Sequence, residues 1–445
     1  MAIMKKGLFK AAAVFLFLAA AMPLGAQTTI TGAYGDYTPY SVFGIGNLSK
    51  QGNTHNRGRG GVGIATRNRR YINYLNPASV TARDSLSFMA DFSLAGSNRL
   101  FTQGDLNNVH NTVNVYDFMI SFPIYRKSAM MLGITPMSDV GYQMKSSFTD
   151  PVLISKSGMF NYNASGGGSI YQAFIAGGVT LWDRVSIGAQ GIYYFGNLRR
   201  NNTLEPSKTD QKKIDIEYDM TVRGITGKFG LQYDLPLNER TTLTFGATYR
   251  LGTKMRGYVD HRQFASISSA VDTIQFRTDT LAKMSANPRF ADELGVGIAI
   301  RSGERWSAEI NYIRSGWGGT NIDKVPGMAN ESEARFSLTS SESFRAGFEI
   351  VPNRNDIRYY LRKCTYMAGL YYDKEYYKIA GQQVTSMGLT FGMTFPILRF
   401  YNGITFGVDV GQRGKNDGNM IRERYVNFTV GFNISDIWFQ KPRYN

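Results

Sequence analysis

The chain of 445 residues contains a single cysteine, Cys364, and only three histidines. A lone cysteine cannot build a disulfide framework, so the stability of the fold must come from non-covalent contacts. His55, His110 and His261 are scattered along the chain and no pair has metal-ligand spacing, whereas a zinc site needs several convergent ligands. Beyond the N-terminus no apolar run is long enough for a membrane-spanning helix, which excludes a helical membrane protein.

Signatures of catalysis and of cofactor binding are missing as well. The chain has no Gly-x-Ser-x-Gly nucleophile elbow and no serine with an evident base. The glycine run Arg57–Ala65 resembles a dinucleotide loop only superficially, because no buried strand precedes it and no helix is expected after it. The loop carboxylates lack calcium-loop spacing and are interpreted as solvated charge. We therefore expect no enzyme activity, no cofactor and no metal.

What the chain does contain is a repeated alternation of apolar and polar residues. About fourteen stretches of roughly ten residues recur from Leu86 to Ile434, and the gaps between them are alternately long and short. Alternation with a period of two gives a strand one apolar and one polar face. Tight turns at one end and long connections at the other are typical of up-and-down barrels in bacterial outer membranes. A soluble β-sandwich would also alternate, but it would not sort its connections by length.

We therefore predict an all-β fold, a 14-stranded antiparallel transmembrane β-barrel with both chain ends on the periplasmic side. The first strand is expected from Leu86 to Leu94, with its apolar residues towards lipid. Trp182–Arg184 is a predicted short turn. Gly196–Tyr218 is predicted to be a long polar loop, and Leu251–Asp292, the longest connection, is expected to extend two strands beyond the membrane.

The N-terminus and the charge of the chain agree with this location. Three lysines precede the apolar run Ala11–Met22, which predicts a cleaved signal peptide over residues 1–26. The formal charge of +16 could indicate nucleic acid, but an exported chain without a basic helix favours anionic lipopolysaccharide as the counter-charge. We expect residues 84–439 to form the barrel and residues 440–445 a periplasmic tail, in the outer membrane of a Gram-negative cell.

Residues 27–83 do not alternate, and they form a polar segment rich in Gly, Asn and Arg with a net charge of about +6. We predict that this segment is a plug in the barrel lumen, with a periplasmic tail as the alternative. Its candidate partners are carboxylates at inward-facing positions of the predicted strands. They are Asp91, Asp117, Glu309, Glu349 and Asp409.

Two interpretations of the basic plug stay open. In the first, ion pairs between plug and wall hold the plug in position, because buried pairs of this kind set position more than they add stability. In the second, arginines of the plug contact an anionic ligand head group. The candidates for this charged gate are Arg67, Arg69 and Arg70.

Several stretches of the segment carry a family resemblance. They are Tyr40–Gly46, the run Arg57–Ala65 and Asn76–Ser79, which begins with Asn-Pro-Ala. Together they resemble the N-terminal hatch of the FadL-type outer-membrane transporters of long-chain fatty acids and other hydrophobic compounds, above all the branch found in Bacteroidota. Similar stretches of that branch recur downstream at Gly166–Gly168, Tyr193–Gly196 and Asp436–Phe439. The resemblance covers nearly the whole mature chain.

The resemblance implies a hatch inside a fourteen-stranded barrel and the passage of hydrophobic molecules, which in the transporter leave sideways through a gap made by a kinked strand. It also assigns residues to the hatch motif, namely Gly58, Gly60, Gly61, Gly63, Asn76, Pro77 and Ala78. This chain departs from the family pattern in its basic hatch and in its tail beyond the closing aromatics.

Two functions follow as predictions. The first is an outer-membrane transporter or channel for hydrophobic compounds such as long-chain fatty acids, with a hydrophobic small molecule as ligand. The alternative is a non-transporting FadL-like barrel subunit of an outer-membrane protein assembly or secretion complex. The predicted fold serves both, and fold alone does not decide function.

Overall fold

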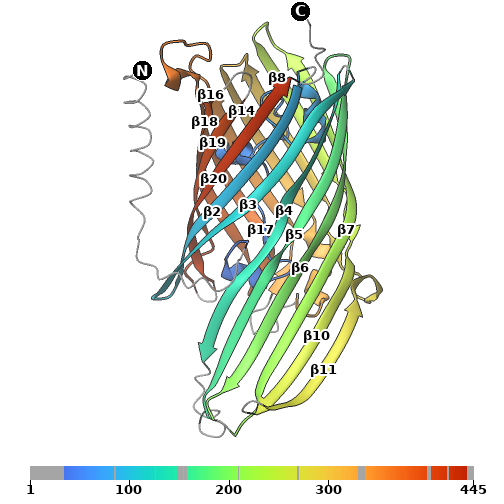
Figure 1. The fold of residues 1–445 in the computed structure, drawn as a ribbon, viewed down its shortest axis with the longest axis vertical. Coiled ribbons are helices and arrows are strands. Elements are labelled where there is room, and N and C mark those ends of the chain that lie inside the picture. The colour runs from blue at the N-terminus through green and yellow to red at the C-terminus, as the bar shows by residue number, and fades with distance from the viewer. Residues whose placement is uncertain are drawn as a thin grey trace, which may run out of the picture.

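Fourteen antiparallel strands close into a ring, as predicted (Figure 1). Strands pair in chain order, and the last strand closes onto the first, with Phe432 opposite Phe92. The ring strands are β2 (Ser87–Gln103), β3 (Leu106–Tyr125), β4 (Ser128–Ser147), β5 (Phe160–Leu181), β6 (Val185–Pro206), β7 (Lys213–Pro236), β8 (Thr241–Arg250), β13 (Glu293–Ser302), β14 (Trp306–Ser315), β16 (Ser341–Ile350), β17 (Thr365–Ile379), β18 (Gln382–Pro396), β19 (Gly403–Arg413) and β20 (Arg422–Ile437).

This computed structural model describes only part of the chain. The predicted signal peptide and the predicted C-terminal tail lie outside the described residues. Within them, no helix is long and apolar enough to cross a membrane. The described residues are 35–84, 87–125, 127–147, 154, 158–208, 210–267, 270–328, 336–397, 402–417 and 420–437.

The alternation in the sequence places apolar side chains on the outside of the ring. In β2, Phe92 is 36% exposed, whereas its neighbours Asp91 and Ser93 point inward and are 5% and 0% exposed. The same division holds in the later strands, where Leu389 and Val410 are about half exposed on the outside. The ring therefore presents an apolar outer band, as a barrel in a membrane does, and an inner wall on which polar residues lie beside a buried apolar cluster.

The connections differ at the two ends of the ring, which we call the turn end and the loop end. At the turn end, Trp182 and Asp183 link β5 to β6 with φ of 47° and 62°, the left-handed backbone of a tight hairpin turn. At the loop end, the prediction of a long polar loop over Gly196–Tyr218 is wrong. Its residues continue β6 and β7, which remain paired beyond the apolar band, as in the Thr203–Asp215 hydrogen bond of 2.6 Å.

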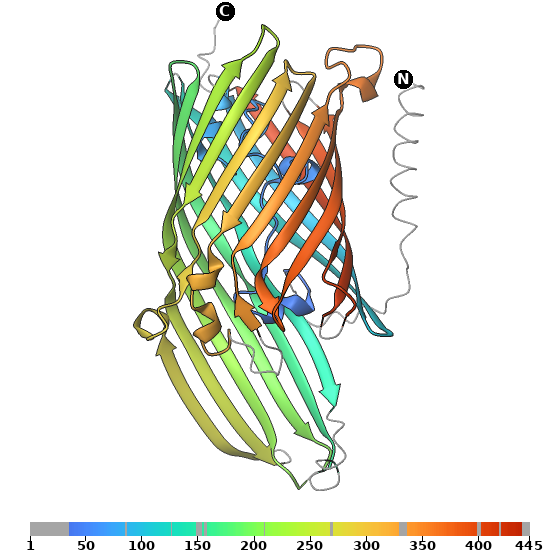
Figure 2. The ribbon, with the colours of Figure 1, turned by 180° about the vertical axis from the view of Figure 1, so that it is seen from behind.

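The loop end extends further on one side of the ring. The connection after β8 contains β10 (Arg256–Ile267), which pairs with the outer half of β7, and β11 (Ala270–Thr280), which pairs with β10. These two strands prolong the β4–β7 sheet well past the ring (Figures 1 and 2). The connection Leu251–Asp292 does extend the sheet beyond the apolar band, but by a separate hairpin on β7, whereas the flanking strands β8 and β13 stop at Arg250 and Glu293.

The remaining elements at the two ends are short. They are β9 (Thr253–Lys254), β12 (Arg289–Phe290), β15 (Phe336–Leu338), η3 (Leu281–Lys283), η4 (Trp317–Gly319), η5 (Ile322–Lys324) and η6 (Tyr360–Lys363).

The segment before the ring lies inside it, and we call residues 35–84 the lumen segment (Figure 2). Its short elements are η1 (Pro39–Val42), β1 (Asn47–Leu48), α2 (Thr54–Gly58) and η2 (Pro77–Ala82). Apolar residues of the segment such as Ile45 and Ile72 are fully buried and share one cluster with wall residues such as Met131 and Tyr376.

One junction of the ring is only partly formed. β4 pairs with β5 along its whole length, but with β3 only from Phe118 opposite Ile134 to the turn. Beyond that point the two strands diverge (Figure 1). Pro136 lies just past the last pair and cannot donate a backbone hydrogen bond, and the register of β4 shifts there. The freed edge of β4 pairs with β1 instead, with Asn47 opposite Asp139.

Candidate functional site

The Asn-Pro-Ala triplet anchors the lumen segment to the wall. Asn76 caps η2, because its side-chain oxygen accepts a hydrogen bond of 3.0 Å from the Ala78 amide. Its amide nitrogen donates to the carbonyl of Ile64 at 2.7 Å and to that of Leu231 on β7 at 3.2 Å. The wall has glycine where the triplet touches it. A Cβ on Gly230 would lie 2.0 Å from the Asn76 side-chain oxygen.

The glycine run makes a second close contact with the wall. Gly60 and Gly61 have φ of 74° and 77°, a conformation that side chains other than glycine rarely adopt. The Gly60 amide donates to Thr390 of β18 at 2.7 Å, and a Cβ on Gly369 of β17 would lie 2.2 Å from the Gly60 nitrogen. The structure thus supports the interpretation of these glycines as packing residues. Gly58 likewise packs against the backbone of Gly392, and Gly63 against Asn56 and Asn73.

The side chain of Arg59 lies at the centre of a buried ion-pair cluster. It is fully buried, and its guanidinium lies 3.3 Å from Glu349 and 3.9 Å from Glu309. Glu349 also contacts His55 at 2.9 Å, and Glu309 accepts a 2.8 Å hydrogen bond from the Ala65 amide. Two predicted wall carboxylates therefore hold the lumen segment, by charge and by backbone contact together.

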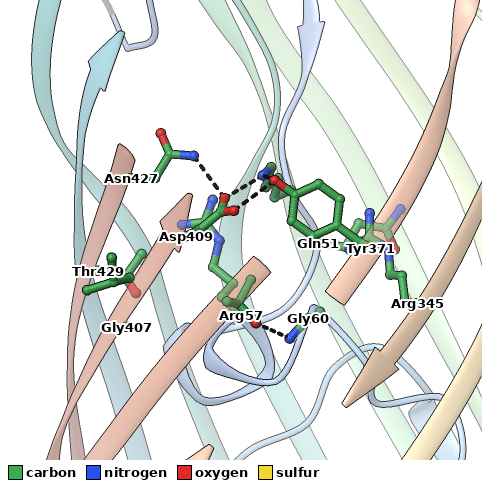
Figure 3. Close-up of a pocket in the computed structure, with 13 residues that line it drawn as sticks. Gln51, Arg57, Gly60, Arg345, Tyr371, Gly407, Asp409, Asn427 and Thr429 are labelled. Carbon is green, nitrogen blue, oxygen red and sulfur yellow. Dashed lines mark hydrogen bonds and ion pairs between the residues drawn. The ribbon is translucent and has the colours of Figure 1, made fainter. Parts of the chain in front are cut away.

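A second cluster forms around Lys50. Its ammonium donates one hydrogen bond to Asp409 of β19 and another, of 2.5 Å, to the Tyr371 hydroxyl. Asp409 also accepts from Tyr371 at 2.7 Å and from Asn427 at 2.9 Å (Figure 3). Among the described residues, the hydrogen bonds to Asp409 thus come from Lys50 of the lumen segment and from Tyr371 and Asn427 of the wall.

The other two predicted carboxylates are also buried at inward positions. Asp91 accepts a hydrogen bond of 3.4 Å from the side-chain amide of Asn53 in the lumen segment. Asp117 accepts a hydrogen bond from Ser93 on the neighbouring strand. The wall therefore contributes carboxylates as predicted, but Asp117 is bonded within the wall.

The three candidate gate arginines lie near the turn end, and each has a carboxylate partner. Arg67 is paired with Asp234 at 2.9 Å and also donates to Ser186 at 2.6 Å. Arg69 and Arg70 both contact Glu304, in the short turn between β13 and β14. These partners were absent from the set predicted from the sequence. The structure brings the arginines to the wall, whereas their role towards a ligand remains a proposal.

The sequence analysis also missed basic residues on the wall itself. Arg99 pairs with Asp36 of the lumen segment at 2.8 Å, Arg413 with Glu375 at 3.0 Å, and Arg250 with Glu293 at 3.1 Å. Arg99 and Arg413 lie beyond the ends of the predicted strands, where the apolar alternation fades. A signal was present, since both share the inward parity of Asp91 and Asp409, respectively.

Polar side chains line much of the cavities between the lumen segment and the wall. The roomiest of those described, about 330 Å³, lies near the turn end, and its lining includes Asp91, Arg70, Lys363 and Asn433. Two others, of about 120 and 70 Å³, are lined largely by charged and hydroxyl side chains. Sites for apolar small molecules are usually lined by hydrophobic and aromatic groups. Among the described residues, these cavities do not provide such a lining. Nor do the described residues hold a group of three or more metal-ligating side chains.

Comparison with known proteins relates the chain to one family and to one fold. A family model described as BamG matches residues 8–445. A search of curated proteins finds no match.

Among solved structures, the Ralstonia pickettii toluene transporter TbuX is similar at a TM-score of 0.56 and 14% identity, over 86% of this chain and 98% of that one. The P. putida toluene transporter TodX has a TM-score of 0.56 and 12% identity, over 88% and 100%. A Pseudomonas aeruginosa FadL homologue has a TM-score of 0.55 and 11% identity, over 88% and 100%. At these identities the likeness establishes a shared FadL-like fold.

Proposed function

The chain belongs to the BamG family, and on that premise we propose that it is a non-transporting outer-membrane barrel subunit of an outer-membrane protein assembly or secretion complex. The observation that carries this proposal is the filled lumen, in which Arg59 and Lys50 are bonded to wall carboxylates. Membership of the BamG family supports the assembly form of the role. The apolar outer band supports the location, with membrane lipid and lipopolysaccharide around the barrel.

Moving the lumen segment out of these contacts costs free energy. Withdrawing Arg59 would leave Glu309 and Glu349 buried without their cation, and such uncompensated charges are strongly unfavourable. Charged and hydroxyl side chains also line two of the cavities, so an apolar ligand there would take hydrogen-bonding groups out of water. We therefore assign the barrel a structural role, in which its strands, turns and loop-end extension contact partner proteins.

The first test is purification of the affinity-tagged chain from its native outer membrane in mild detergent. We expect a stoichiometric complex that contains a second barrel protein. We also expect depletion of the chain to lower the amounts of other outer-membrane barrels. A solitary barrel, together with unchanged amounts of other barrels after depletion, would overturn the proposal.

Transport of hydrophobic compounds, such as long-chain fatty acids, is the second candidate. It is favoured by the divergence of β3 and β4, which leaves a partly formed junction in the wall. On this reading Arg67, Arg69 and Arg70 would form the charged gate, and a ligand head group would compete with Asp234 and Glu304 for them. The test is binding of oleate and toluene to the purified protein, and their uptake with and without the gene. Saturable binding and gene-dependent uptake would favour transport over the structural role.

A further inference from the structure

The edge of β3 that faces the partly formed junction pairs with no described strand over most of its length. From Leu106 to Asp117, β3 pairs with β2 on one side, whereas its pairing with β4 begins only at Phe118. In the described residues no other strand pairs with this stretch. The outward side chains of Val113 and Val115 on this stretch are 81% and 53% exposed. An unpaired edge offers a row of backbone donors and acceptors to another strand.

The opposite edge of the junction is already occupied by an added strand. The lumen segment bonds along β4, through β1 and through backbone hydrogen bonds from Ser49 to Met137 at 3.0 Å and from Thr38 to Gly141 at 2.8 Å. Its contacts with β3 are made by side chains instead, such as the stacking of Tyr37 on His110. The junction thus accepts an extended segment by strand addition on the β4 side, whereas no described strand pairs with this side of β3 before Phe118.

The two faces of the open edge differ in polarity. Val113 and Val115 lie on the outer face, and Asn111 is the next outward residue towards the β2–β3 hairpin. Thr112 and Asn114 lie on the inner face, in a cavity of about 70 Å³ that Asp36 also lines. A segment that fits both sides has apolar residues alternating with polar ones, which is the pattern of an outer-membrane barrel strand. A hydrocarbon matches the outer face alone, and this cavity is smaller than the roughly 150 Å³ apolar cavity known to hold benzene.

We propose that the edge of β3 from Leu106 to Asp117 docks an amphipathic β-strand of another outer-membrane protein, which pairs antiparallel with β3. This proposal rests on the assembly role and identifies where such a protein would be held. Backbone hydrogen bonds provide the attraction, and the alternation of side chains provides the selection. The docked strand lies beside β3 at the position from which β4 diverges.

The experiment uses the full-length purified barrel and a defined peptide. The probe is a synthetic peptide with the sequence of Tyr425–Ile434, an alternating strand of this chain. The control peptide has the same composition, with its apolar residues grouped together. A photocrosslinker is attached to Val113→Cys or Val115→Cys, and to Leu389→Cys as the matched control, which is outward-facing but lies on a fully paired strand.

We expect the alternating peptide to crosslink at position 113 roughly tenfold more than at position 389, and the grouped peptide to show no preference. Strand pairing also fixes the register. The crosslinked peptide residue should therefore move by two positions, in the antiparallel direction, between Val113→Cys and Val115→Cys. This register readout separates pairing from non-specific adhesion of an apolar peptide.

Three outcomes would overturn the proposal: equal crosslinking at positions 113 and 389, equal crosslinking of both peptides, or loss of the crosslink in saturating toluene or oleate. The last outcome would assign the junction to a small hydrophobic ligand. The result is independent of the purification test above. A stable complex without peptide docking would reject only this site, whereas a solitary barrel would reject the assembly role.

Discussion

Individual residues of the lumen segment form ion pairs of two physical kinds. Arg59 has no exposed surface, and its partners Glu309 and Glu349 are almost fully buried. Arg69 is 48% exposed, and its partner Glu304 is 42% exposed. Water and salt screen the second pair but not the first. The predicted pairing of a basic plug with an acidic wall therefore combines contacts of very different strength.

Substitution of Arg59 tests this difference. We expect Arg59→Ala to lower the free energy of unfolding by about 3–5 kcal/mol, because it leaves two buried carboxylates without their cation. Arg69→Ala is the matched control and should cost about 0–1 kcal/mol, as exposed pairs do. The measurement is urea unfolding in detergent, in which electrophoretic mobility distinguishes the folded from the unfolded protein. Equal effects of the two substitutions would contradict the buried-cluster account.

The lone cysteine gives a second prediction about a single residue. Cys364 is buried just before β17, and burial raises the pKa of its thiol to about 11. At pH 8, the fraction of Cys364 in the thiolate form is then about a hundredfold smaller than that of an ordinary cysteine. The thiolate is the form that reacts. We expect maleimide to label the native protein very slowly. Labelling as fast as that of an ordinary water-exposed cysteine would show that the site is open.

Whole elements were predicted well where one face meets the apolar band and poorly elsewhere. Period-two alternation identified the strands and the turn at Trp182–Asp183, because burial in lipid imposes that pattern. It failed for Gly196–Tyr218, because these residues extend beyond the apolar band, where lipid no longer imposes an apolar outer face, although inward residues such as Leu198 and Arg200 stay buried. The position of η2 depends on wall glycines far away in the sequence, and no local pattern reports such a contact.

The seat of η2 can be tested from the wall side. Gly230→Ala places a methyl group on the Asn76 side chain, and we expect it to cost about 1–3 kcal/mol, as overpacking does. Gly177→Ala is the matched control, since its new methyl group meets no atom closer than 3.8 Å, an ordinary van der Waals contact. The readout is maleimide labelling of Ala78→Cys. It should rise in the Gly230→Ala background alone, and an unchanged labelling rate would mean that η2 is seated by other contacts.

For the molecule as a whole, closure of the ring and filling of its lumen have different origins. The ring follows from a pattern repeated along the chain, so the sequence predicts it. The filling follows from pairs such as Arg67 with Asp234 and Arg99 with Asp36, whose members are distant in sequence. Composition predicts that charges will meet, but only the fold decides which ones. The carboxylates were therefore predicted as a class, and several actual partners were not.

Electrical conductance tests the filled lumen directly. In a planar bilayer we expect the protein to show no sustained openings, because ion pairs hold the lumen segment against several strands at once. The double variant Arg59→Ala/Arg67→Ala removes two separated anchors, so local opening of the segment becomes less costly and discrete conductance steps should appear. The matched control is Arg69→Ala, whose half-exposed pair contributes little. Steady conductance by the unaltered protein would instead reveal an open lumen, and transport would then replace the structural role.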